Sequence, residues 1–146
     1  MNDFKTSVEV RWSDLDPNFH LRHSVYYDWA AFVRLKFLNE HQITPAYMQH
    51  RQFGPILFRE ECVFKREIVF GDVAEINLKL LKAREDFSRW SIRHEIVKNG
   101  ETIAATITVD GAWMNTRIRK LDLPPKEIFD AFESIEKDEN FELMKS

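Results

Sequence analysis

The segment from Arg11 to Arg34 reads RWSDLDPNFHLRHSVYYDWAAFVR and contains a polar turn followed by the start of a long helix. Residues 13–23 include aspartate, proline and asparagine, which favour turns. Ser24 is the predicted N-cap, because its hydroxyl can accept a hydrogen bond from an amide of the first helical turn. The helix should run to about Glu40, and apolar side chains cover almost its whole circumference. A helix of this kind is buried.

Strand patterns lie on both sides of this helix. The segment Lys5–Trp12 alternates apolar and polar residues, which predicts a first strand. Four further strands are predicted after a mixed segment that ends at Gln52: Ile56–Phe64, Val73–Lys82, Phe87–Lys98 and Thr102–Asn115. The alternation is clearest in the last two, so one face of each should be buried.

Turn residues mark where these elements end. Asn99 and Gly100 separate the last two strands and predict a type I′ hairpin, since both positions tolerate a positive φ. Pro124 and Pro125 should stop the sheet, and a short terminal helix is predicted from Lys126 to about Lys137. The order of one strand, one buried helix and a meander of antiparallel strands indicates the α+β class.

Composition and charge narrow the class of protein. The 146 residues are 44% hydrophobic, which is enough for one core, and we expect a single domain over residues 1–146. The net charge of −3 contains no long block of one sign, so neither nucleic-acid binding nor a polybasic membrane anchor is indicated. Cys62 is the one cysteine, and no segment resembles a signal peptide or a membrane span. We therefore expect a cytoplasmic protein.

The Arg11–Arg34 segment resembles the start of the 4-hydroxybenzoyl-CoA thioesterase-like family of hotdog proteins. In that family an aspartate follows the first strand and a tyrosine opens the central helix ten residues later, as Asp16 and Tyr26 do. His20 and Arg34 match a histidine and an arginine of related acyl-CoA thioesterases. The resemblance implies a hotdog fold, in which a five- or six-stranded antiparallel sheet wraps a long central helix. We also expect a homodimer or homotetramer, because such a sheet leaves strand edges open.

The same resemblance implies an enzyme that hydrolyses an acyl-CoA thioester to the free acid and CoA. Asp16 would serve as general base or nucleophile, and the backbone amide of His23 at the helix N-terminus would bind the oxyanion. Both roles suit a helix N-terminus, where unpaired amides and the helix dipole favour negative charge. His20, Arg22 and Tyr26 are the candidate substrate-binding residues. No metal or other cofactor is implied.

Two departures from the family pattern leave a second function open. Phe19 stands where many relatives have glycine, and Ala31 stands where several branches have a helix glutamate. These changes fit either a divergent thioesterase or a non-catalytic protein that binds acyl-CoA or an acyl lipid. A dehydratase-type hotdog enzyme fits less well, because that branch uses a histidine in another loop motif. The acyl group, and CoA against acyl carrier protein as thiol carrier, stay open.

Other polar residues have structural interpretations. Asp14 is typical of a turn, and His94 lies on the apolar face of its strand, where a hydrogen-bonded core residue is expected. His20 and His23 have no partners that would complete a zinc site. Cys62 has no histidine motif that would make it a nucleophile. The basic residues that could meet CoA phosphates, none of them preferred over the others, are Arg84, Arg89, Arg117, Arg119 and Lys120.

Overall fold

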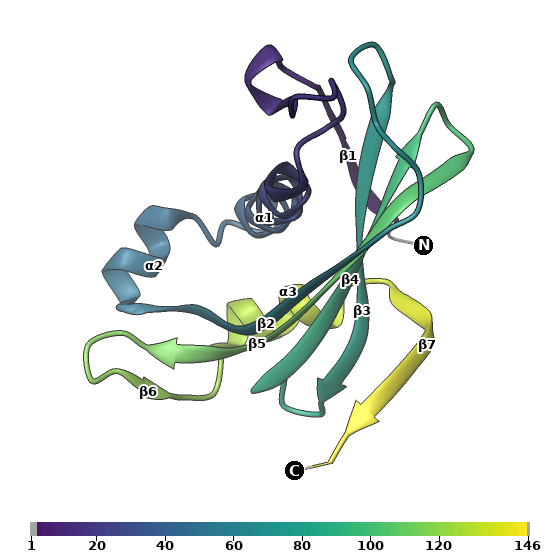
Figure 1. Cartoon of the computed structure of the whole chain (residues 1–146). Coiled ribbons are helices and arrows are strands. Elements are labelled where there is room, and N and C mark those ends of the chain that lie inside the picture. Colours follow the sequence, from purple (N-terminus) through teal and green to yellow (C-terminus); the bar gives the residue numbers. More distant parts are fainter. Residues whose placement is uncertain (1–2, 146) are drawn as a thin grey trace.

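A computed structural model describes residues 3–145, in which a curled sheet surrounds one long helix (Figure 1). The strands are β1 (Phe4–Val8), β2 (Phe53–Phe64), β3 (Ala74–Arg84), β4 (Arg89–Lys98), β5 (Thr102–Asn115), β6 (Lys120–Leu121) and β7 (Lys137–Met144). The helices are the 3-10 turn η1 (Trp12–Asp14), α1 (His23–Glu40), α2 (Pro45–Arg51) and α3 (Lys126–Glu133). The long helix inside a sheet confirms the predicted α+β hotdog arrangement.

The sheet has the order β1-β3-β4-β5-β2, and all neighbours in this order are antiparallel. β1 and β7 share the outer edge of β3, since β1 pairs with Ala74–Leu78 and β7 with Leu80–Arg84. The short strand β6 extends the sheet beside the end of β5. Among residues 3–145, no strand pairs with the outer edge of β2.

The prediction missed strands at the margins of the sheet. The observed sheet has seven strands in place of the expected five or six, and β7 pairs with β3 in parallel. The terminal helix also ends at Glu133, short of the predicted Lys137. Half of the β7 sequence KDENFELM is charged, so it carries little strand signal. β7 is placed by tertiary contacts, among them the ion pair of Asp138 Oδ2 with Arg93 Nη1 at 3.3 Å.

The first strand is shorter than predicted. It ends at Val8, and Trp12–Asp14 forms η1 instead. Asp14 is buried, and its carboxylate accepts hydrogen bonds from the backbone N and the guanidinium of Arg11. The same contacts lower the pKa of Asp14. Asp14 is thus a turn residue, as expected, because its side chain satisfies a backbone donor of the turn.

The hairpin and the core follow the sequence closely. Asn99 and Gly100 have φ angles of 54° and 78°, and Glu101 N donates to Lys98 O, which confirms the predicted tight turn. The buried side chains of α1 are Val25, Tyr26, Trp29, Ala30, Val33, Phe37 and Leu38. Its other side is not covered, and Phe32 and Leu35 remain about half exposed. The helix is therefore less completely enclosed than its composition suggested.

No helix within residues 3–145 is both long and apolar enough to cross a membrane.

Candidate active site

Asp16 lies in a tight loop between η1 and α1. Its backbone N donates to His20 O at 2.8 Å, and its Oδ1 accepts from Asn18 N at 2.8 Å and from His20 N at 3.0 Å. Asparagine and aspartate side chains commonly stabilise turns by accepting such backbone hydrogen bonds. Oδ1 of Asp16 therefore stabilises the loop. Oδ2 accepts no hydrogen bond from any residue in the range 3–145. One oxygen therefore holds the carboxylate in place, and the other is free for a ligand.

The N-terminus of α1 follows directly. The helix begins at His23 with Arg22 as N-cap, so the predicted N-cap Ser24 is wrong. The Ser24 hydroxyl instead accepts a hydrogen bond from Arg22 Nη1, which removes it from the helix amides. The first amides of a helix have no acceptor within the helix. Outside the helix, no acceptor among residues 3–145 bonds to His23 N. This N–H is a donor available to a ligand.

These groups meet in one pocket of about 360 Å³. It is lined by Asp16, His20, Leu21, His23, Tyr26, Phe64, Lys65, Arg66 and Glu67. Four of the five predicted site residues are thus brought together by the loop, the start of α1 and the end of β2. Arg22 does not line the pocket, because its guanidinium donates to Ser24 Oγ and to Ser13 O.

Tyr26 and His20 both belong to this lining. The Tyr26 ring packs edge-on against Phe64, with centroids 4.8 Å apart, and burial raises the pKa of its phenol to about 12. The phenol therefore keeps its proton at neutral pH. His20 Nε2 lies 3.2 Å from Glu67 Oε2. Residues 3–145 contain no cluster of three or more histidine, cysteine or acidic residues suited to a metal ion.

Sequence reasoning missed the contribution of Lys65, Arg66 and Glu67. They follow the end of β2, about forty positions after His23, and reach the pocket because β2 runs back toward the start of α1. The adjacent basic pair at a strand end was a usable signal. The arginines that were considered lie elsewhere; Arg89, for example, stacks on Phe58 at 4.9 Å.

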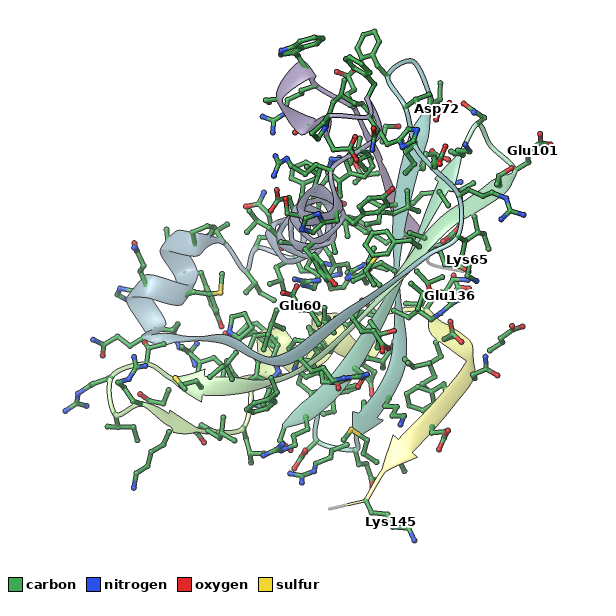
Figure 2. All side chains as sticks on the ribbon, viewed as in Figure 1. Glu60, Lys65, Asp72, Glu101, Glu136 and Lys145 are labelled. Carbon is green, nitrogen blue, oxygen red and sulfur yellow. The ribbon has the colours of Figure 1, made fainter. Side chains whose placement is uncertain are left out.

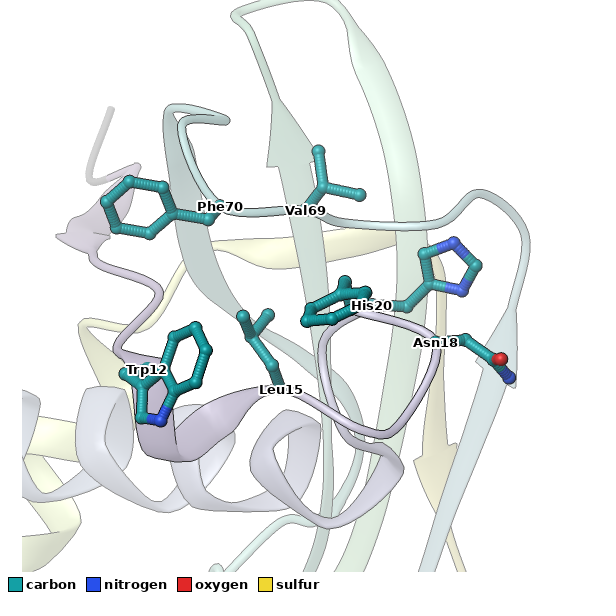
Figure 3. A pocket seen from close by; sticks show the side chains of 7 residues that line it. Trp12, Leu15, Asn18, His20, Val69 and Phe70 are labelled. Atoms are coloured by element: carbon teal, nitrogen blue, oxygen red, sulfur yellow. The ribbon is translucent and has the colours of Figure 1, made fainter.

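A second, larger pocket of about 560 Å³ adjoins the first and shares His20 with it. Figure 3 shows Trp12 and Phe70 across from His20 and Asn18, with Leu15 and Val69 between them. Phe19 completes the lining with a φ of 63°, the left-handed conformation that glycine adopts without strain. This backbone conformation explains why a glycine would suit the position. The side chain of Phe19 adds to the apolar wall.

The motif residue Arg34 does not reach the Asp16 pocket. Its Nη1 lies 3.0 Å from His94 Nε2, and His94 Nδ1 lies 2.8 Å from Asn77 O. A carbonyl can only accept and a guanidinium can only donate, so His94 is neutral with its proton on Nδ1. Burial, and then the charge of Arg34, lower the pKa of His94 to about 3. His94 is therefore the hydrogen-bonded core residue that its strand position predicted.

Because His94 stays neutral when folded, acid should destabilise the protein before its carboxylates titrate. The folded pKa of about 3 lies below the unfolded value of 6.5, so the unfolded chain binds more protons in this interval and stability falls as pH falls. We expect the free energy of unfolding to fall by about 2 kcal/mol between pH 6.5 and 5. Urea unfolding at each pH measures it. In the His94→Gln variant the free energy of unfolding should depend less steeply on pH. An equally steep dependence would contradict the role assigned to His94.

Cys62 lies in β2, and burial raises the pKa of its thiol to about 11. The thiol is therefore protonated at neutral pH and is a poor nucleophile.

Comparison with known proteins identifies the family and supports the fold. Residues 10–132 match the family model of the thioesterase-like superfamily. A hypothetical protein of Staphylococcus aureus solved in complex with CoA is 20% identical, with a TM-score of 0.81 over 95% of this chain and 91% of that one. A 1,4-dihydroxy-2-naphthoyl-CoA thioesterase of Synechocystis is 15% identical, with a TM-score of 0.81 over 91% and 97%.

A thioesterase of Thermus thermophilus, complexed with coenzyme A and Zn, is 22% identical, with a TM-score of 0.73 over 89% of this chain and 91% of that one. None of the curated proteins matches the chain. The structural likenesses establish the fold, and the family match spans most of the sequence. The chain therefore belongs to the thioesterase-like superfamily, in agreement with the thioester hydrolase predicted from its sequence.

Proposed function

We propose that the protein hydrolyses an acyl-CoA thioester to the free acid and CoA, with Asp16 and the His23 amide as its catalytic groups. One observation carries this proposal: Asp16 and His23 line the same pocket, and within residues 3–145 neither Asp16 Oδ2 nor the His23 N–H has a hydrogen-bond partner. A carboxylate base or nucleophile and an oxyanion donor are the two parts that acyl transfer to water requires.

The reaction follows from these two groups. Asp16 either takes a proton from a water that attacks the thioester carbonyl carbon, or attacks that carbon itself before water releases the acid. In both routes the carbonyl oxygen becomes an oxyanion, which accepts a hydrogen bond from His23 N–H and gains from the α1 dipole. The C–S bond then breaks and CoA leaves. Tyr26, neutral at physiological pH, supplies a further donor in the pocket.

The two adjoining pockets suit the two ends of the substrate. Lys65 and Arg66 give the Asp16 pocket a basic rim that can meet CoA phosphates. The pocket that contains Trp12, Phe19 and Phe70 is largely apolar and suits an acyl group. Superfamily neighbours solved with CoA support CoA as the thiol carrier.

The direct test is thiol release from a panel of aliphatic and aromatic acyl-CoA substrates. Turnover identifies the acyl class that the protein accepts. The second candidate, a non-catalytic acyl-CoA-binding protein, is favoured by the bulky Phe19 in the loop and by the absence of a helix carboxylate at Ala31. It predicts saturable binding of acyl-CoA with no thiol release at any chain length.

We also propose that the chain forms a homodimer through the outer edge of β2. This edge is unpaired within residues 3–145 and bears the half-exposed side chains Val63 and Phe64, and Phe32 and Leu35 of α1 are about half exposed as well. An open apolar edge strand favours pairing with another strand. Two-fold pairing of β2 with the β2 of a second copy would pair its free backbone groups without leaving a new open edge.

A dimer is expected to show twice the chain mass in light scattering. Val63→Lys should yield a monomer, because a lysine at an edge strand opposes pairing. Val73→Lys, at a more exposed valine outside β2, is the matched control and should stay dimeric. A native chain that scatters as a monomer would overturn the dimer.

A further inference from the structure

The three most exposed aromatic side chains within residues 3–145 line one pocket. Trp12, Phe19 and Phe70 are 82%, 63% and 72% exposed, and all three belong to the pocket of about 560 Å³ that adjoins the Asp16 pocket. In the described part of the chain, none of them packs against another aromatic ring. Exposed apolar side chains are usually scattered singly over a surface, so three rings in one pocket indicate a binding surface.

Backbone hydrogen bonds hold the loops that carry these rings. Leu21 N donates to Ile68 O at 2.7 Å, which joins the Asp16 loop to the loop after β2. Phe70 lies in a turn that Asp72 closes, because Asp72 Oδ2 accepts from Val69 N at 2.9 Å. Figure 2 shows Asp72 at the end of the molecule where η1 also lies. A ligand would therefore meet a wall whose backbone is already positioned, which lowers the entropic cost of binding.

Phe19 and Phe87 share an unfavourable backbone conformation but differ in what offsets it. Their φ angles are 63° and 58°, in the left-handed region where a Cβ atom is strained. The Phe87 ring is buried against Phe129 and Phe132, with centroids 4.9 and 6.1 Å apart, so core packing offsets the strain. The mostly exposed Phe19 ring gains little from burial. Strain that the fold does not need indicates a functional role for this side chain.

We infer that Phe19 is a specificity-determining residue, and that its ring binds a bulky apolar acyl group together with Trp12 and Phe70. Ligand binding, in place of folding, then offsets the strain at Phe19. The three rings would contribute by removing apolar area from water, and by ring contacts where the acyl group is itself aromatic. A short acyl group such as acetyl is too small to cover the rings and gains little from them.

This inference rests on the proposed function, in which the pocket beside Asp16 takes the acyl group, and it adds which acyl groups are selected. It also gives a reason for the bulky residue at position 19. The same selection is expected in a protein that binds acyl-CoA without cleaving it. The test therefore measures binding, with ligands that cannot be hydrolysed.

Isothermal titration calorimetry with two thioether analogues tests the selection. S-phenacyl-CoA and S-acetonyl-CoA have a CH₂ group between the carbonyl carbon and the sulfur, so no thioester is present, and they differ only in phenyl against methyl. We expect the native chain to bind S-phenacyl-CoA about tenfold more tightly or better. Equal affinities would overturn the inference. Selective binding without thiol release from any acyl-CoA would overturn the proposed hydrolysis and leave the inference standing.

Variants of Phe19 test its role directly. Phe19→Gly and Phe19→Asn both remove the ring, and both residues tolerate a left-handed backbone. Each should bind S-phenacyl-CoA about tenfold more weakly and S-acetonyl-CoA as the native chain does. Gln52→Gly is the matched control, because Gln52 has a φ of 52° at the end of α2 and lines neither pocket. It should change neither affinity, and native selectivity in either folded Phe19 variant would refute the role.

Thermal unfolding separates a role in binding from a role in folding. The Tm of Phe19→Gly should equal or exceed that of the native chain, because glycine relieves the strain and little buried area is lost. The Tm of Phe87→Gly should fall by about 10 °C or more, because this substitution removes a ring from the core. If the Tm of Phe19→Gly falls as far, the Phe19 ring belongs to the fold and the inference is wrong.

Discussion

Asp16→Asn is expected to lower kcat for acyl-CoA hydrolysis by about 10³-fold, within the range for loss of a catalytic base. An amide can neither take the proton of an attacking water nor form an acyl intermediate. The fold should survive, because asparagine Oδ1 can still accept the hydrogen bonds of Asn18 N and His20 N. Thiol release under saturating substrate measures the effect, and equilibrium binding of acyl-CoA should change little.

Asp86→Asn is the matched control. Asp86 Oδ1 accepts from Ser88 N in a turn of the same kind, and this turn lies between β3 and β4, outside the Asp16 pocket. Its replacement should leave kcat unchanged. Native turnover in Asp16→Asn would remove Asp16 from the mechanism.

His23→Pro should lower kcat by about 10²–10³-fold, the usual cost of one oxyanion donor. Proline lacks the backbone N–H but is well tolerated at the first position of a helix. Arg22, the preceding residue, has φ −67° and ψ 138°, which is the conformation that a residue before proline prefers. The variant thus removes the backbone N–H together with the imidazole ring, while the backbone can keep its path.

The control for this variant is His23→Ala, which removes the ring and keeps the N–H. It should retain most of kcat, and the contrast between the two variants isolates the backbone donor. Circular dichroism should show equal helix content in both. If both variants lose activity equally, the imidazole and not the amide is the important group, and the oxyanion donor must lie elsewhere.

The order of the elements was predictable because most core elements have strong local patterns. Two-residue alternation identified β4 and β5, and Asn99–Gly100 identified their hairpin. The margins were not predictable, because β7 is charged and is held by contacts such as Arg93 with Asp138. The predicted N-cap of α1 was wrong, because the Ser24 hydroxyl bonds to Arg22 and not to the helix amides.

The sequence by itself determined which chemistry is available near Asp16, because Asp16, His20, His23 and Tyr26 lie in one short segment whose turn and helix bring them together. Only the tertiary structure decided what surrounds them. Lys65 and Arg66 meet the pocket through the return of β2, and Phe19 takes a left-handed conformation.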